Sequence, residues 1–321
     1  MSSADHEAKW SDALQAFVKN LEKLKPHERI ADEYNGEKGF QNFVLTESAE
    51  CWDDFLQWVN ALEDGSWCFR GQREAVWSLT TSLDRAVFRH KVSENSASSY
   101  HLNRRLEESD LLFRFQQQAH QYLTHLPDSD DRASWLALMQ HYGVPTRFLD
   151  WTMSPYVGMY FALEEEPVRE EKLSSLWAID LAWLKKKAEQ LVVSSYGKMA
   201  FLTPILWANM VNELLRDFTK EQSVILPVNP YIGNDRLSSQ QGLLLCKLFH
   251  EAPFYGLLMS MIINPNLTEW PVIRRLEVRA EDRIEFLKKL RTMNLHRLSL
   301  FPGLDGFGRL LKLDLELKDN G

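Results

Sequence analysis

Apolar residues recur at three- and four-residue steps along much of the chain, which is the period of an amphipathic helix. Such runs predict helices over 4–24, 48–62, 103–125, 131–142, 198–219 and 281–292, and a run that is apolar nearly all round predicts a buried helix over 156–163. Shorter apolar runs without that period, bounded by glycine or polar residues, predict strands near 40–45, 67–71, 146–150, 176–179, 223–228, 242–248 and 272–278. The polar stretch 91–100 is expected to be a surface loop, and the chain is expected to end in a helical or extended segment.

The predicted helices and strands alternate irregularly rather than in regular βαβ units. The expected fold class is therefore α+β, with a mixed, short-stranded sheet core surrounded by helices and a helical N-terminal portion. The sequence contains no internal repeat, low-complexity tract or long linker. We expect an N-terminal helical extension over 1–44, one main domain over 45–312 and a short C-terminal tail over 313–321.

Composition narrows the classes of function. The 321 residues include 37 Lys and Arg against 45 Asp and Glu, a net charge of −8, and 45% are apolar, which excludes global disorder. The negative charge disfavours nucleic acid as a partner unless basic residues gather locally. The sequence has no apolar run of about 18 residues and no apolar signal core near Met1, so we expect a cytoplasmic protein without a membrane partner.

Cysteine and histidine spacing gives no sign of a metal site. The three cysteines include no C-x-x-C pair, and the nine histidines form no H-E-x-x-H motif. We therefore predict no metal cofactor and expect reduced thiols.

Candidate chemistry begins at Phe69-Arg70-Gly71-Gln72, where an arginine lies within an aromatic, strand-like run. A guanidinium is costly to bury alone, so Arg70 is expected to meet a carboxylate or an anionic ligand. Gly71 lets another backbone or a ligand approach closely. A structural ion pair and a ligand site both stay open here.

A second segment reads Q-H-Y-G-V-P-T-R-F-L-D-W-T over 140–152 and is followed by Ser154-Pro155. Serine and proline are favoured at the start of a helix, so a strand–turn–helix corner is predicted. The corner would place Asp150 and Thr152 beside the free N–H groups of a helix N-terminus, where anions are favoured. The alternative is that Arg147 pairs with Asp150 and only fixes the turn.

A third segment, R-L-S-S-Q-Q-G over 236–242, carries neutral amides into an apolar strand. Gln241 would then be held on a rigid edge as a hydrogen-bonding group. A plain surface loop before the strand explains the same residues.

These segments, with W-x-F-R-G-Q over 67–72, S-P-x-x-x-x-Y-F-A over 154–162 and L-F-P-G-L-D-G over 300–306, resemble the FRG domain. That family of bacterial and phage proteins is named for its Phe-Arg-Gly motif, and the order of motifs is the same. The resemblance covers roughly 45–312. Phe148 stands where the family more often has Leu, and Gly158 where Ala is usual. The resemblance implies an effector in phage defence or in a toxin-like system.

A more distant analogy in motif order connects the FRG domain with ADP-ribosyltransferases, and it implies NAD as a small anionic nucleotide ligand. Arg70 would then hold phosphate or ribose, with Gly71 and Arg147 completing the anion site. His141, Thr152 and Ser154 would orient the ribose, and Tyr142 or Trp151 would stack on nicotinamide. Asp150 would supply the carboxylate that glycosidic cleavage needs. Gln240 and Gln241 replace the acidic residue of the transferases' third motif, so Gln241 is the expected catalytic group there.

Three classes of function therefore stay open. The first is an NAD-using transferase or glycohydrolase that modifies a macromolecular acceptor. The second is a non-catalytic module that senses a nucleotide or a phage protein. The third, disfavoured by charge, binds or cleaves nucleic acid through basic residues over 70–91, 104–105 and 274–291.

Overall fold

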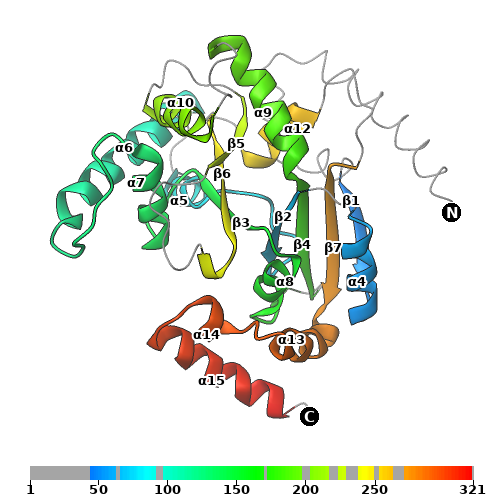
Figure 1. Ribbon diagram of the computed structural model, residues 1–321. Helices are drawn as coiled ribbons and strands as arrows, with labels where there is room; N and C mark the ends of the chain where they lie inside the picture. The colour runs from blue at the N-terminus through cyan, green and yellow to red at the C-terminus, as the bar shows by residue number, and fades with distance from the viewer. Residues whose placement is uncertain are drawn as a thin grey trace.

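The computed structural model describes residues 44–62, 66–91, 97–169, 172–196, 203–216, 223–228, 238–248, 253–262 and 271–319 (Figure 1). The helix expected over 4–24, and with it the helical N-terminal portion, lies outside these residues. So does most of the strand expected near 40–45.

A mixed sheet of seven strands forms the centre of the structure, in the order β1-β7-β4-β2-β3-β6-β5. The strands are β1 (Leu45–Ala49), β2 (Trp67–Gln72), β3 (Phe148–Thr152), β4 (Leu173–Asp180), β5 (Ile225–Val228), β6 (Gly242–Lys247) and β7 (Ile273–Arg279). β1 and β7 pair in parallel, and every other neighbouring pair is antiparallel. The predicted α+β class with a mixed sheet is confirmed.

Helices build a hydrophobic core on each face of this sheet. One core takes residues from α6 (Ala97–Ala119), α7 (Arg132–His141), α9 (Leu181–Tyr196), α10 (Pro204–Arg216) and α12 (Phe254–Ile262). The other takes residues from α4 (Trp52–Asn60), α8 (Pro155–Leu163), α13 (Arg283–Thr292), α14 (Arg297–Leu300) and α15 (Leu304–Asp319). α5 (Ser82–Lys91) packs beside α6, and a short 3-10 helix (Ala280–Asp282) joins β7 to α13.

Strand periodicity explains why one sheet supports two cores. Successive side chains of a strand point to opposite faces. Cys68 and Trp177 accordingly pack into the core with α9, whereas Phe69 and Leu176 pack into the core with α8.

The sheet has one weak junction, between β2 and β3, which we call the seam. All six residues of β2 pair with β4, and all five residues of β3 pair with β6. Across the seam only Phe69 and Thr152 pair. The sheet therefore consists of two well-paired halves that meet at a single residue pair.

Helix α8 bridges the seam, because it follows β3 along the chain yet packs on β2 and β4. Gly71 allows that packing. A Cβ atom at this position would lie 2.1 Å from the carbonyl oxygen of Gly158 and 2.4 Å from the amide nitrogen of Ala162. The close approach expected at Gly71 is thus made by the backbone of a helix.

Three departures from the sequence-based elements have local causes. α6 begins at Ala97, inside the stretch expected to be a loop, and its serines occupy the first helical turn. α9 was not predicted because it follows β4 without a loop, the Asp180 carboxylate accepting hydrogen bonds from the amides of Ala182 and Trp183. α12 was not predicted because nearly all of its residues are apolar and, unlike α8, no Ser-Pro pair marks its start.

Candidate functional site

Arg70 lies on β2 at the seam. Its Nη1 donates a 2.6 Å hydrogen bond to the main-chain carbonyl oxygen of Asp150 on β3, beyond the one residue pair that joins the strands. Its Nε is buried and has no hydrogen-bond partner among the described residues. One side chain therefore connects the two half-sheets and keeps unused donor capacity.

The electrostatic surroundings of Arg70 favour a negative partner. Burial lowers the pKa of the guanidinium, and the like charge of Arg85 lowers it further, while Asp150 opposes both. The Asp150 side chain is exposed. Arg70 is thus a cation between an acid and a second cation, and because desolvation is the largest of the three effects, a further anion would stabilise it.

Polar residues continue from Arg70 across the same face of the sheet. Arg70 pairs with Trp177 of β4, and Trp177 pairs with Arg275 of β7. The Arg275 guanidinium lies 5.2 Å from the centre of the Trp177 ring, and Arg275 also pairs with Glu277. We call Arg70, Trp177 and Arg275 the polar row.

The polar row also contains unused hydrogen-bonding groups. Arg275 Nε is buried without a partner among the described residues, as is Ser175 Oγ in the next row of the sheet. Trp177 Nε1, in contrast, donates a 2.7 Å bond to Gln72 Oε1. Buried polar atoms are normally satisfied, so unused ones indicate a place where water or a ligand binds.

Trp151 follows Asp150 on β3 and belongs to the core with α9. Its Nε1 is likewise buried with no hydrogen-bond partner in the described ranges. The sequence suggested that this ring would stack on nicotinamide. The structure instead buries the ring, so an unused N–H is what it offers near the seam.

Thr152 and Ser154 have their hydroxyl groups committed to the β3–α8 corner. Thr152 Oγ1 donates to the carbonyl oxygen of Gln240 at 2.7 Å and accepts from the amide of Ser154 at 3.1 Å. Ser154 Oγ accepts from the amide of Val157 at 3.3 Å, as the predicted N-cap. Both residues are buried, so the ribose contacts expected of them give way to a structural role.

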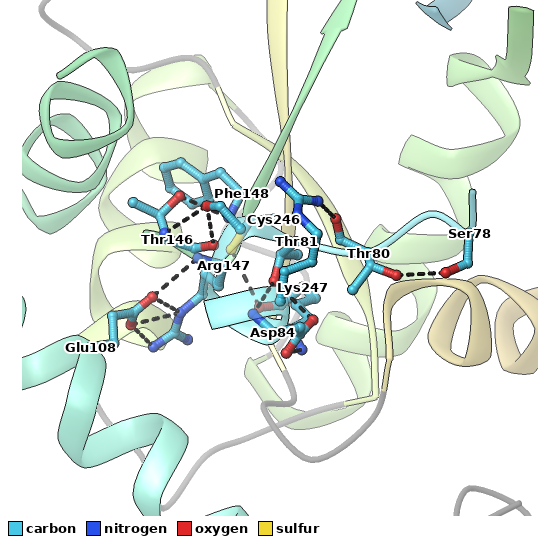
Figure 2. Close-up of polar contacts among 12 residues, drawn as sticks. Ser78, Thr80, Thr81, Asp84, Glu108, Thr146, Arg147, Phe148, Cys246 and Lys247 are labelled. Carbon is cyan, nitrogen blue, oxygen red and sulfur yellow. Dashed lines mark hydrogen bonds and ion pairs between the residues drawn. The ribbon is translucent and has the colours of Figure 1, made fainter. Parts of the chain in front are cut away.

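Arg147 lies in the core and not at the seam. Only 1% exposed, it contacts the fully buried Glu108 of α6 through Nε at 2.8 and 2.9 Å and through Nη2 (Figure 2). The alternative in which Arg147 pairs with Asp150 to fix the turn is therefore incorrect. The Glu108 carboxylate compensates the charge of the buried Arg147 guanidinium. This pairing places Arg147 outside the expected anion site.

A second buried ion pair lies next to the first. Lys247 of β6 contacts Asp84 of α5 at 2.6 Å, and Asp84 also accepts a hydrogen bond from Thr81 at 2.8 Å (Figure 2). Cys246 lies between the two pairs, and burial raises its pKa to about 12. The sequence analysis missed this pair, whose only local signal is a lysine inside an apolar strand.

His141 and Tyr142 lie at the end of α7. Tyr142 is exposed, and its ring contacts His141 with 4.8 Å between centroids and Phe115 of α6 with 6.4 Å. These contacts place the two residues on the α6–α7 pair, outside the Arg70–Asp150 contact.

The third motif contacts the seam residue Thr152 through the Gln240 carbonyl oxygen, and its side chains bind the C-terminal motif. Gln240 Nε2 and Ser239 Oγ each donate a 3.1 Å bond to the carbonyl oxygen of Leu300. Gln241, the residue expected to be catalytic, is exposed and has a φ of 47°, a left-handed conformation at the turn into β6. Its neighbour Gln240 is therefore the buried, hydrogen-bonded member of the pair.

The C-terminal motif is also attached to α8. Arg297 Nη1 contacts both carboxylate oxygens of Glu164, at 2.7 and 2.8 Å. The guanidinium of Arg297 lies over the ring of Phe301, which contacts Phe161 with 5.9 Å between centroids. The motif thus belongs to the packed domain.

Basic residues over 274–291 do not form a free cationic face, because each of the five arginines there contacts a carboxylate. The pairs are Arg274–Glu47, Arg275–Glu277, Arg279–Asp282, Arg283–Glu316 and Arg291–Asp314. Within the residues that the structure describes, no three His, Cys, Asp or Glu side chains are grouped to hold a metal ion. In the same residues, no helix is long and apolar enough to cross a membrane.

Residues 65–171 match the family model of the FRG domain. The chain carries an FRG domain. The matched range contains both sides of the seam, Arg70 and Asp150, together with α8 as far as Leu163. The third and C-terminal motifs lie beyond the FRG match and are joined to it through the contacts of Gln240 and Arg297. Searches of curated proteins and of solved structures found no match.

Proposed function

We propose that this FRG-domain protein binds a phosphate-bearing nucleotide at Arg70, that NAD is the ligand, and that Asp150 assists cleavage of its nicotinamide–ribose bond. The observation that carries the proposal is the state of Arg70. It is a partly buried guanidinium whose hydrogen bond goes to a carbonyl, not a carboxylate, and whose Nε is unused. Burial of such a cation is unfavourable until an anion joins it.

The neighbours of Arg70 support a ligand with more than one charge. Arg85 lies within electrostatic range of Arg70, and Arg275, two strands away in the polar row, pairs with Glu277 but keeps an unused Nε. Strands are spaced about 4.8 Å apart, so the Cα atoms of Arg70 and Arg275 are roughly 10 Å apart. A diphosphate with its attached ribose spans such a distance better than a single phosphate does.

The chemistry assigned to Asp150 follows from its position. When the bond between ribose C1′ and the nicotinamide nitrogen breaks, its electron pair leaves with nicotinamide and positive charge develops on the ribose. The exposed Asp150 carboxylate, which lies within electrostatic range of Arg70, would stabilise that charge. Water or a nucleophile of a macromolecular acceptor then adds to C1′. We place this activity in the cytoplasm, in phage defence or a toxin-like system.

The experiment has a binding arm and a turnover arm. Calorimetry with NAD should show saturable binding that Arg70→Ala weakens by at least about tenfold, equivalent to about 1.4 kcal/mol. Arg279→Ala removes an exposed arginine at the end of β7 and serves as the matched control. Nicotinamide release should be lost in Asp150→Asn while NAD affinity is retained.

The outcomes separate the enzyme from the alternatives. Absence of NAD binding, or binding unaffected by Arg70→Ala, rejects the site. Binding without nicotinamide release, for protein and nucleic-acid acceptors alike, rejects the enzyme. The same result supports a nucleotide-sensing module, the second candidate, which is favoured by the amides Gln240 and Gln241 in place of an acid. If the protein acts in phage defence or in a toxin-like system, induced expression should arrest bacterial growth for the wild type and not for Arg70→Ala.

A further inference from the structure

Helix α15 has an apolar inner face and an apolar outer face. Leu310 and Leu313 are buried on the inner face. Four large side chains on the outer face remain exposed, at 44% to 85% of their surface: Leu304, Phe307, Leu311 and Leu315. We call these four residues the outer stripe. In Figure 1, α15 lies at the edge of the molecule, beyond α13 and α14.

The spacing of the outer stripe is that of one continuous side of a helix. Its steps of three, four and four residues keep all four side chains within one arc. Single exposed apolar residues are ordinary, but a continuous stripe of this kind marks an interaction surface.

We propose that the outer stripe is a homodimer interface, in which α15 of a second copy of this chain crosses it antiparallel about a two-fold axis. In such an interface the two residues of each facing pair lie equally far from the two-fold axis, so the mean residue number is about the same for every pair. Leu304 opposite Leu315 of the second copy has its midpoint at position 309.5, and Phe307 opposite its Leu311 has it at 309, half a residue away. One register therefore pairs all four apolar residues.

Charge complementarity supports the same register. Asp305 and Lys312 lie on one flank of the stripe, and both are exposed. Neither side chain takes part in a hydrogen bond or ion pair within the described part of the chain. Antiparallel helices bring the same flanks together, so Asp305 of each copy faces Lys312 of the other, with a midpoint within one residue of the apolar pairs. A self-complementary charge pattern is what a second copy requires, and an unrelated apolar partner does not account for it.

The residue at the crossing point is also suited to close contact. Gly308 lies beside the outer stripe near the shared midpoint. A Cβ atom built on it would meet nothing within 4 Å. The absence of a side chain at this position lets the two helix backbones approach closely. Because the interface uses one helix per copy, we expect it to be small and the dimer to be concentration-dependent.

The test measures the oligomeric state of the full chain by analytical ultracentrifugation, from low to high micromolar concentration. The wild type should show reversible dimerisation. Leu311→Glu should weaken it by at least about tenfold, whereas Val168→Glu, at a similarly exposed apolar residue outside α15, should leave it unchanged. Asp305→Lys and Lys312→Asp should each weaken dimerisation, and the double variant should restore it. Circular dichroism checks that every variant is folded.

Three results overturn the proposal. One is a wild type that stays monomeric at every concentration. A photo-cross-linker at position 311 that captures residues 1–43 of the same chain in that monomer would show that this segment, and not a second copy, covers the outer stripe. The second is a dimer that Leu311→Glu does not affect. The third is a charge swap that fails to restore dimerisation, since this excludes the antiparallel register.

Discussion

Arg70 and Arg147, the arginines of the first two motifs, make opposite kinds of contact. Arg70 donates to the carbonyl oxygen of Asp150 and keeps an unused Nε. Arg147 is sealed against the carboxylate of Glu108. One arginine therefore has capacity for a ligand, and the other has its charge compensated inside the fold.

This contrast predicts different effects on stability. Arg147→Ala should lower the free energy of unfolding by about 3–5 kcal/mol, because it leaves the buried Glu108 without its hydrogen-bonded partner and with Arg132 only at 3.8 Å. Arg70→Ala should lower it by no more than about 1.5 kcal/mol, because it removes one hydrogen bond and a partly desolvated charge. Urea unfolding of the two variants measures both. A variant with both Arg147→Met and Glu108→Leu should regain most of the loss, and equal losses for the two alanine variants would contradict the assignment.

A second pair of variants tests how closely α8 approaches the sheet. Gly71→Ala should destabilise the protein by several kcal/mol, since its Cβ would collide with backbone atoms of α8. Gly158→Ala should be tolerated, because its Cβ meets side-chain atoms, of which Leu176 Cδ1 at 2.7 Å can move aside. Alanine also gains about 1 kcal/mol of helix propensity. Thermal unfolding should rank the two variants in this order, and the reverse order would refute the packing argument.

His296 makes the start of α14 sensitive to pH. Its Nδ1 accepts a hydrogen bond from the amide of Ser299 at 3.2 Å, which requires the neutral ring. Burial, followed by the charge of Arg291, lowers the pKa of His296 below its ordinary value of 6.5. A lowered pKa means that this contribution is complete above pH 6.5 and is lost as the pH falls through the folded-state pKa.

The comparison variant is His296→Asn, which supplies a cap that does not titrate. Loss of a cap costs about 0.5–2 kcal/mol, so the wild type should lose stability relative to His296→Asn as the pH is lowered from 7 toward 5. Chemical unfolding across that range measures the difference. A difference that does not change with pH would show that His296 does not act as the cap.

Variants of Gln241 test whether the backbone conformation or the side chain of this residue matters in the third motif. Its φ of 47° is unfavourable for a residue with a Cβ, so Gln241→Gly should raise the free energy of unfolding by up to about 1 kcal/mol. Gln241→Ala keeps the strain and should not stabilise the protein. Thermal unfolding distinguishes them, and nicotinamide release by the glycine variant tests the catalytic role predicted for the amide.

Elements with strong local signals could be predicted from the sequence. The aromatic strand around Arg70 and the Ser154-Pro155 start of α8 lie where expected, because alternation and capping are local properties. The close approach at Gly71 was also expected, although the sequence did not indicate what would approach. These features place Arg70 and Asp150 together.

Contacts between distant segments could not be predicted. Glu108 is 39 positions from Arg147, and Asp84 is 163 positions from Lys247. Nothing local distinguishes these two acids from solvent-exposed ones, so the sequence left Arg147 to be assigned to the ligand. Likewise, the sequence predicted that the side-chain amides of the third motif would be held on a strand edge. In the structure Gln240 Nε2 donates a hydrogen bond to the carbonyl oxygen of Leu300.

The seam gives the FRG domain a mechanical property. Two half-sheets, each fully paired within itself, meet at one residue pair, with α8 across one face and Arg70 reaching from one half to the other. The anion that we propose to bind the unused donors of Arg70 beside Asp150 would touch both halves at once. Its binding energy would then add to the energy that holds the two half-sheets together, so the bound protein would resist separation of the sheet at the junction that has the fewest strand pairs.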